Sequence, residues 1–272
     1  FIDANNNGGH VMADIPTSHP RRASLLSRQR LVDAAKLGLL ADSALIAHGR
    51  GEAFDYLLNE RTCDSARTAI REVAARLQAA EHPVISINGN TAVLAGKSLI
   101  RVAAILGCPI EVNIYYRTPE RIENLLVLLK NQRQEISEEI APKKFSGNWK
   151  SKVEAVKILG AISDGRILGL EGPRSLCSAD GIGSADVILV PLEDGDRCEA
   201  LIALGKQVLV IDLNPLSRTA RQATVTIVDE VSRASSLLFS YIVEEKSNPT
   251  DWDNDVVLKD ALEVMAQSVK RI

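Results

Sequence analysis

The sequence predicts an α/β protein: a three-layer α/β/α domain of the Rossmann-like class with a mainly parallel sheet. Two short runs rich in Val, Ile and Leu stop abruptly in polar clusters, one before Glu193 and the other before Asp212. Continuous apolar runs of this length are typical of strands buried on both faces, as in parallel sheets. Strand-like runs also alternate with helix-like stretches along the chain, which is the pattern of α/β domains.

Six short apolar runs predict the strands of this sheet. In chain order they span residues 44–47, 83–87, 109–112, 187–192, 208–211 and 223–228. Residues that favour turns, such as Gly, Pro, Asn and Asp, bound these runs.

Helix-like stretches separate the predicted strands. In chain order they are residues 24–38, 64–81, 91–106, a helix that opens at Pro119, residues 153–162 and 198–204, and two C-terminal helices joined by the polar linker 246–255. Asp64 or Ser65 is the expected N-cap of its helix, since either side chain can accept a first unpaired N–H group. Pro119 suits the first position of a helix. Residues 131–152 are polar and charged, which favours an insertion or a mobile loop.

Bulk composition limits the classes of function. The 272 residues suffice for one large domain, which we expect at residues 12–272. The net charge of −3 argues against a partner nucleic acid, because phosphate backbones are bound by concentrated basic faces. The sequence lacks both an apolar run of ~20 residues and the Cys-x-x-Cys spacing of zinc sites, so neither a membrane span nor a transition-metal site is expected. Residues 1–11 are polar, and we expect a leader that is either foreign to the natural chain or disordered.

Five predicted strand ends carry polar clusters. They are His48-Gly-Arg50-Gly-Glu52, Asn88-Gly-Asn90, Asn113 with Arg117, Glu193-Asp-Gly-Asp-Arg197, and Asp212-Leu-Asn214. Each cluster alone suits an ordinary turn. Ligands of open parallel sheets, however, bind just beyond the carboxyl ends of the strands. Five clusters at one sheet edge therefore predict a shared site.

The charged residues near these ends suit a phosphorylated ligand. Guanidinium groups are permanently charged, bidentate donors for phosphate and carboxylate, and the arginines concerned are Arg28, Arg50, Arg117, Arg197 and Arg218. Each of them can equally be a solvated surface residue. Asp194 and Asp196 can either hold Mg²⁺ on a nucleotide or cap the helix that follows. His48 can be an acid–base group or a structural histidine.

One alternative rests on a string that nearly matches the phosphate-loop pattern. Residues 91–98 end in Gly96-Lys97-Ser98, and Asp212 could serve as a magnesium aspartate. This would make the protein a magnesium-dependent phosphate-loop-like NTPase. The first glycine of the pattern is replaced by Thr91, however, and its Cβ crowds the turn that cradles the anion. A non-catalytic nucleotide-binding regulator is the third hypothesis.

Long unbroken strings give a further indication. They run in order from IPTSHPR (15–21) through LIAHGRGEAFDYL (45–57), ERT (60–62), PVISINGN (83–90), EVN (111–113), YRT (116–118), VPLEDGDR (190–197) and DLNPLSRTA (212–220) to IVD (227–229). In these strings the chain closely resembles the archaeal phosphopantothenate synthetase family, also called 4-phosphopantoate–β-alanine ligases. Residues 131–176 match the family weakly.

The resemblance implies a cytoplasmic homodimer that acts in coenzyme A biosynthesis. Such enzymes condense the small molecules 4-phosphopantoate and β-alanine, and they convert ATP to AMP and pyrophosphate. By analogy, the reaction passes through an acyl-adenylate, and Mg²⁺ accompanies the ATP.

The resemblance also implies roles for individual residues. Arg28 and Arg50 correspond to contacts with the ATP phosphates. The expected nucleotide cradle consists of Asp194, Gly195, Asp196, Arg197, Asp212, Leu213, Asn214, Ser217, Arg218 and Thr219. Candidates for binding phosphopantoate are Asn88, Asn90, Asn113 and Arg117. The catalytic candidates are His48, Arg50 and Glu52. Neither the sequence nor the resemblance fixes the general base, for which His48 and Glu52 are the two candidates.

Overall fold

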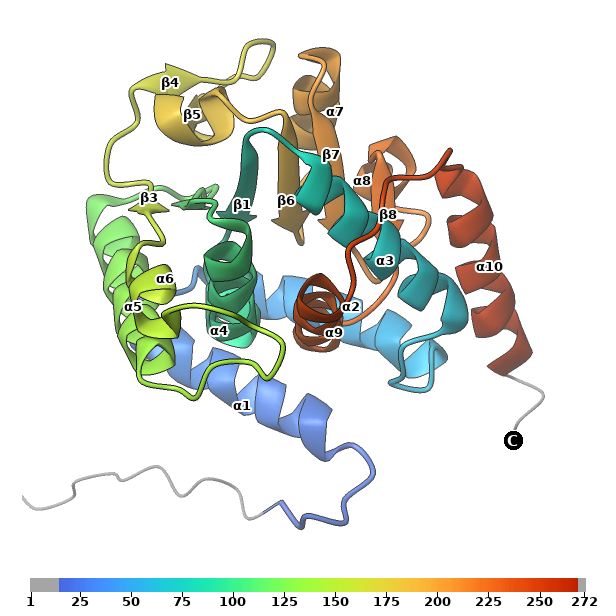
Figure 1. Cartoon of the computed structure of the whole chain (residues 1–272). Coiled ribbons are helices and arrows are strands. Elements are labelled where there is room, and N and C mark those ends of the chain that lie inside the picture. Colours follow the sequence, from blue (N-terminus) through green and yellow to red (C-terminus); the bar gives the residue numbers. More distant parts are fainter. Residues whose placement is uncertain (1–14, 269–272) are drawn as a thin grey trace, which may run out of the picture.

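A parallel sheet forms the middle layer of the molecule (Figure 1). Among residues 15–268, which the computed structural model describes, it contains six strands. In sheet order they are β3 (Ile158–Leu159), β2 (Ile110–Val112), β1 (Pro83–Ile87), β6 (Val187–Pro191), β7 (Gln207–Ile211) and β8 (Val225–Ile227). Every neighbouring pair is parallel, which confirms the predicted fold class.

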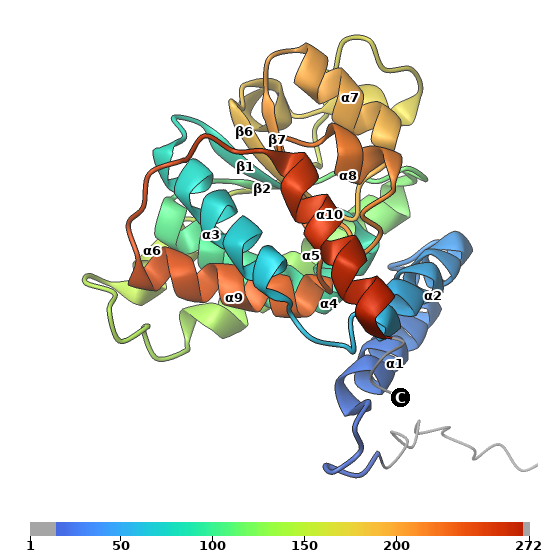
Figure 2. The ribbon, with the colours of Figure 1, turned by 90° about the vertical axis from the view of Figure 1, so that its right-hand side faces the viewer.

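Helices cover both faces of this sheet and the edge formed by the carboxyl ends of its strands (Figure 2). They are α1 (Arg22–Lys36), α2 (Asp42–Leu57), α3 (Asp64–Ala79), α4 (Gly89–Leu106), α5 (Pro119–Ser137), α6 (Trp149–Glu154), α7 (Gly195–Ala203), α8 (Arg218–Gln222), α9 (Val231–Glu244) and α10 (Asn254–Gln267). Val187 and Leu189 of β6 belong to the core formed with α3, α4, α5 and α9. The alternate residues Ile188 and Val190 pack with Leu201 of α7. Figure 2 shows α7 on one side of the strands and α3 and α9 on the other.

The strand order places a switch point between β1 and β6. From β1 the chain continues to β2 and β3 on one side, whereas from β6 it continues to β7 and β8 on the other. The carboxyl ends of these two neighbouring strands, Ile87 and Pro191, therefore flank a crevice from which the connections diverge. Crevices of this kind are the usual ligand sites of doubly wound sheets.

The strand expected at 44–47 is wrong, because these residues lie inside helix α2. Asp55 is the only buried residue of α2, all of which the structure describes, so the short run never enters the sheet. Leu45 and Ile46 are 37% and 68% exposed. A run of four apolar residues does not distinguish a strand from a helix segment.

The polar segment 131–152 is more ordered than expected. Its first seven residues continue α5 to Ser137, and Trp149 begins α6. The Trp149 indole is buried and its N–H donates to the carbonyl of Ile136 at 3.1 Å. The helix expected at 153–162 gives way to the end of α6 and to β3. The N-cap of α3 is Cys63 rather than Asp64 or Ser65.

Helix α4 runs through the hydrophobic core. Its 18 residues are long and apolar enough to cross a membrane by length and composition, but 67% of that window is buried inside the molecule. The string that resembles a phosphate loop lies within this helix, and Lys97 pairs with Glu135 of α5. Gly96 permits close packing, since a Cβ there would lie 2.2 Å from Oε1 of Gln132. A continuous helix has no anion-cradling loop, so the phosphate-loop hypothesis is wrong.

Residues 1–11, where the sequence predicts a leader, lie outside the described residues.

Candidate active site

A cleft of about 1890 Å³ opens at the carboxyl ends of β1, β2, β6 and β7, and α1, α2 and the start of α9 complete its walls. Most of the expected residues line it: His48, Arg50, Glu52, Asn88, Asn90, Asn113, Asp194, Gly195, Asp196, Arg197, Asp212, Leu213, Asn214, Ser217, Arg218 and Thr219. Two expected residues in the described part of the chain, Arg28 and Arg117, lie outside its lining. Residues from all five polar clusters thus meet at one site, although the first cluster arrives on a helix and Arg117 of the third stays outside.

A strained turn joins the strand ends at the switch point. Leu192 has φ +58°, a left-handed conformation that bulky side chains rarely adopt. Its N–H donates to the carbonyl of Ile211 at 3.0 Å. Its own carbonyl accepts from the side-chain amide of Asn88 at 2.9 Å. The Asn88 side chain also accepts from the N–H of Thr91 at 3.0 Å, so its amide is occupied in holding β1, β6 and α4 together.

A buried ion pair braces the turn that follows. Arg197 is 2% exposed, and its guanidinium bonds to Glu193 and to the Ser86 hydroxyl. Burial raises the pKa of Glu193, and the charge of Arg197 opposes that shift. The Thr219 hydroxyl donates to the Glu193 carbonyl at 2.8 Å and ties this turn to the next. Arg197 therefore shapes the cleft wall more than it offers a free cation.

The loop after β7 folds back on Asp212. One carboxylate oxygen of Asp212 accepts from the N–H of Asn214 at 2.9 Å, and the other accepts from the Ser217 hydroxyl at 2.5 Å. The Ser217 oxygen in turn caps α8 by accepting from the N–H of Ala220. Burial raises the pKa of Asp212. The loop therefore forms a compact wall of the cleft.

Arg174, which the sequence analysis missed, lies beside this wall. It belongs to the connection between two short strands, β4 (Gly165–Arg166) and β5 (Leu176–Cys177), and lines the cleft. Its guanidinium pairs with Asp194 and Asp196 and stacks over the ring of Tyr115 at 4.6 Å. The only sequence signal is an arginine after the turn-forming Gly-Pro pair 172–173.

Glu52 gathers donors from α1. Its carboxylate accepts from Arg21 at 3.0 Å, from the Ser24 hydroxyl at 2.5 Å, and from two nitrogens of Arg28 at 3.0 and 2.8 Å. Burial alone would raise the pKa of Glu52, but hydrogen bonds from Arg28 and Ser24 hold it below its usual value. Glu52 thus links α1 to α2 and has little capacity to accept a further proton.

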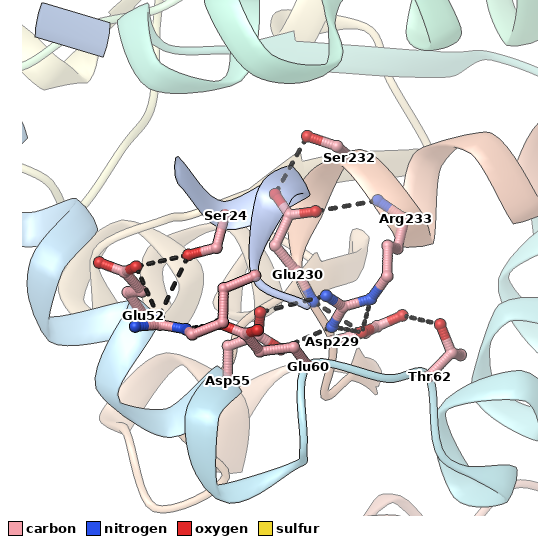
Figure 3. A network of polar contacts seen from close by, with 10 residues as sticks. Ser24, Glu52, Asp55, Glu60, Thr62, Asp229, Glu230, Ser232 and Arg233 are labelled. Carbon is pink, nitrogen blue, oxygen red and sulfur yellow. Dashed lines mark hydrogen bonds and ion pairs between the residues drawn. The ribbon is translucent and has the colours of Figure 1, made fainter. Parts of the chain in front are cut away.

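A second ionic network fixes α2 over the strand ends (Figure 3). Arg233 of α9 bonds to Asp55 of α2 and to Asp229, which follows β8. The Thr62 hydroxyl donates to Asp229 at 2.6 Å. Burial raises the pKa of the fully buried Asp229, whereas the neighbouring Arg233 lowers it. In the turn after α2, Glu60 has φ +52°.

Helix α2 presents His48 and Arg50 to the cleft. The Nε2 atom of His48 is buried and has no hydrogen-bond partner among residues 15–268. Burial lowers the pKa of this imidazole, which favours its neutral form at pH 7. Arg50 is exposed, and no described residue bonds to its guanidinium. Among residues 15–268, the exposed guanidinium of Arg50 is therefore available to ligands, whereas Nε2 of His48 is unpaired but enclosed.

The residues expected to bind phosphopantoate are already engaged with the protein. The amide of Asn90 donates to the carbonyl of Ala44 at 3.0 Å, and that of Asn113 donates to Leu176 at 2.9 Å. The Oδ1 atom of Asn90 is buried and lacks a partner among the residues described. Arg117 bonds instead to the Gly160 carbonyl and the Ser163 hydroxyl, away from the cleft.

The chain is similar over most of its length to proteins of one family. The model of the phosphopantothenate/pantothenate synthetase family matches residues 65–272. A 4-phosphopantoate–β-alanine ligase of Thermococcus kodakarensis is 44% identical over 248 residues, which cover 91% of this chain and 86% of the relative. Ligases with the same name from Methanospirillum hungatei and Methanosarcina mazei are each 42% identical, over 95% of this chain and over 99% and 97% of the relatives.

Proposed function

The chain belongs to the phosphopantothenate/pantothenate synthetase family, and we propose that it is an ATP-dependent 4-phosphopantoate–β-alanine ligase of coenzyme A biosynthesis. This family membership confirms the resemblance identified from the sequence. The observation that carries the activity is this similarity over 91–95% of the chain, together with a polar, arginine-lined cleft at the switch point of the sheet.

The proposed chemistry has two steps. A carboxylate oxygen of 4-phosphopantoate attacks the α-phosphorus of ATP. A new bond forms between this carboxylate oxygen and the α-phosphorus. The bond between the α-phosphorus and the oxygen that it shares with the β-phosphorus breaks, and pyrophosphate leaves. The amine of β-alanine next attacks the acyl carbon, the C–N bond forms, AMP leaves with the oxygen, and the nitrogen loses a proton. Positioning and charge stabilisation supply most of the catalysis in such reactions.

Each wall of the cleft suits one part of these reactants. The compact loop after Asp212 and the start of α7 suit the nucleotide, and the unpaired guanidinium of Arg50 suits its phosphates. To bind a phosphate of ATP, Arg28 would have to give up its hydrogen bonds to Glu52. We assign the remaining space, beside the asparagines at the ends of β1 and β2, to phosphopantoate.

Mg²⁺ would be held mainly by the nucleotide. No group of three or more His, Cys, Asp or Glu side chains suited to a metal ion occurs within residues 15–268. Mg²⁺ on a nucleotide, however, requires only one or two carboxylates beside phosphates and waters. Asp194 and Asp196 line the cleft, and either would have to share its oxygens between Arg174 and the ion. The ion would neutralise charge on the phosphates.

His48 is our candidate for the group that takes the proton from the amine. Its Nε2 atom has no hydrogen-bond partner among the described residues, and burial lowers the pKa of the imidazole, which favours the neutral form. Glu52, by contrast, already accepts from three side chains and acts as a positioning residue.

We further propose a cytoplasmic homodimer. The α1–α2 hairpin exposes large apolar side chains, among them Leu37 at 70%, Ile46 at 68% and Tyr56 at 63%. A second copy of the chain would cover them.

The decisive experiment is incubation with ATP, Mg²⁺, 4-phosphopantoate and β-alanine, followed by mass spectrometry. The ligase produces 4′-phosphopantothenate, AMP and pyrophosphate, and only when phosphopantoate is supplied. ADP and phosphate would instead indicate an NTPase, and ATP binding without turnover would indicate a regulator.

A further inference from the structure

Arg174 is fixed at the wall of the cleft although it lies outside the sheet framework. Its side chain is 16% exposed, and it reaches the start of α7 from the one-turn 3₁₀ helix Pro173–Ser175. Asp194, Asp196 and the ring of Tyr115 hold it. An arginine confined in this way has lost most of its rotamer freedom before any ligand arrives, so a ligand that binds it meets a pre-organised group.

The hydrogen bonds of Arg174 leave one edge of its guanidinium open. Of five N–H donors, Nη1 uses two, toward Asp194 at 2.7 Å and toward Oδ1 of Asp196 at 3.0 Å. Nη2 uses one, toward Oδ2 of Asp196 at 2.6 Å. The Nε–H and the second N–H of Nη2 therefore have no acceptor in the part of the chain that the structure describes.

These two donors point the same way, because Nε and Nη2 share one edge of a guanidinium. Arg28 shows what that edge does in this protein, since it holds both oxygens of Glu52 with Nε and Nη2 at 3.0 and 2.8 Å. The same fork matches two oxygens of a phosphoryl group. Arg174 offers the fork unoccupied, in a cleft that Asn113 and Asp194 also line.

A phosphate can bind at this wall of the cleft only if a positive charge offsets the carboxylates of Asp194 and Asp196. Asp194 and Asp196 are 62% and 39% exposed and carry two negative charges against the single positive charge of Arg174. Without the arginine, this wall would repel any phosphate, because like charges at short range disfavour each other. The two carboxylates thus fix the arginine, and the arginine shields a phosphate from them.

Building on the proposed function, we propose that Arg174 binds a phosphoryl group of a substrate through its free Nε/Nη2 edge. Both ATP and 4-phosphopantoate carry such a group. The start of α7 lies on the side of the cleft assigned to the nucleotide, whereas Tyr115 follows the strand end assigned to phosphopantoate.

Binding measurements distinguish the two sources. We would titrate the wild type, Arg174→Ala and Arg174→Lys with pyrophosphate, AMP, 4-phosphopantoate and pantoate by calorimetry. Loss of two charge-assisted hydrogen bonds should weaken one phosphorylated ligand about 10- to 100-fold. If the contact is to ATP, the affinity for pyrophosphate or for AMP falls. If it is to the hydroxy acid, the affinity for 4-phosphopantoate falls and that for pantoate does not. Lysine should restore only part of the loss, because it lacks the fork.

Arg166→Ala is the matched control, since Arg166 is an exposed arginine of the neighbouring strand β4 and should bind every ligand as the wild type does. Unchanged affinity of both Arg174 variants for all four ligands would overturn the proposal, and so would full restoration by lysine. If the alanine variant does not fold, the lysine variant gives the result. Arg174-dependent pyrophosphate binding in a wild type that forms no phosphopantothenate would refute the proposed function and leave this inference standing.

Discussion

Nη2 of Arg233 lies 2.6 Å from Oδ1 of Asp55, although 178 residues separate them in the sequence. The same nitrogen lies 2.5 Å from Asp229 (Figure 3). One guanidinium therefore joins α2, the end of β8 and the first turn of α9. This contact explains how a helix with a single buried residue keeps His48 and Arg50 over the strand ends.

We expect Arg233→Ala to destabilise the fold strongly. The change would leave the carboxylates of Asp55 and Asp229, which are 5% and 0% exposed, without their cation. Breaking a buried pair in this way costs about 3–5 kcal/mol of unfolding free energy. Urea unfolding measures the loss. Arg166→Ala is the control with an exposed arginine, and a loss below about 1 kcal/mol would contradict the structural role of the network.

Replacing two helical glycines by alanine should change the stability of the protein in opposite directions. Gly49 lies in α2 with nothing within 4 Å of an added Cβ, so Gly49→Ala should stabilise the protein by about 0.5–1 kcal/mol through helix propensity. A Cβ at Gly96 in α4 would lie 2.2 Å from Gln132, so Gly96→Ala should destabilise it by about 1–3 kcal/mol. Thermal unfolding of both variants tests the comparison, and equal shifts would refute it.

The sheet was predictable because its strands are buried on both faces, and burial leaves continuous apolar runs such as 187–191 in the sequence. Helix α2 was not predictable, because tertiary ion pairs rather than an apolar stripe hold it. Asp55 and Arg233 are distant in the sequence, and neither has a local pattern that predicts their contact.

The same reasoning accounts for the site residues. Polar strand ends indicated Asp194 and Asp212 because strand direction alone sends them to one edge of the sheet. Arg174 reaches that edge from an irregular connection, whose path depends on packing that the sequence does not display. Arg117 met every local criterion, yet it donates to Gly160 and Ser163 outside the cleft, because its side chain points to the loop after β3.

Replacing Arg50 should remove activity and leave the fold intact. The exposed guanidinium has no partner in the described part of the chain, so Arg50→Ala removes no protein contact. Loss of a bidentate phosphate contact should lower kcat/KM about 100- to 1000-fold, while the unfolding temperature stays the same. Near-normal turnover would refute the assigned role.

Lys97→Ala is the matched control for that experiment, because it also removes a positively charged side chain. Lys97 lies on α4 and pairs with Glu135, and both side chains are about half exposed (48% and 58%). Surface pairs of this kind contribute about 0–1 kcal/mol, so both activity and stability should stay close to wild type. An inactive Lys97→Ala enzyme would restore the phosphate-loop hypothesis that the helix excludes.

The pH dependence of turnover should identify His48. Burial lowers the pKa of this imidazole below its usual value of about 6.5. A base works when it is deprotonated, and His48 is already deprotonated near pH 7, so kcat/KM for β-alanine should not change there through titration of His48. It should then fall as the pH drops through the lowered pKa. In His48→Gln this acidic limb should disappear and the rate should fall about 100-fold or more. Any slope that remains then belongs to the amine of β-alanine.

His82→Gln, at the amino end of β1 and away from the cleft lining, controls for loss of a histidine. An unchanged acidic limb in His48→Gln would assign the proton transfer to another group.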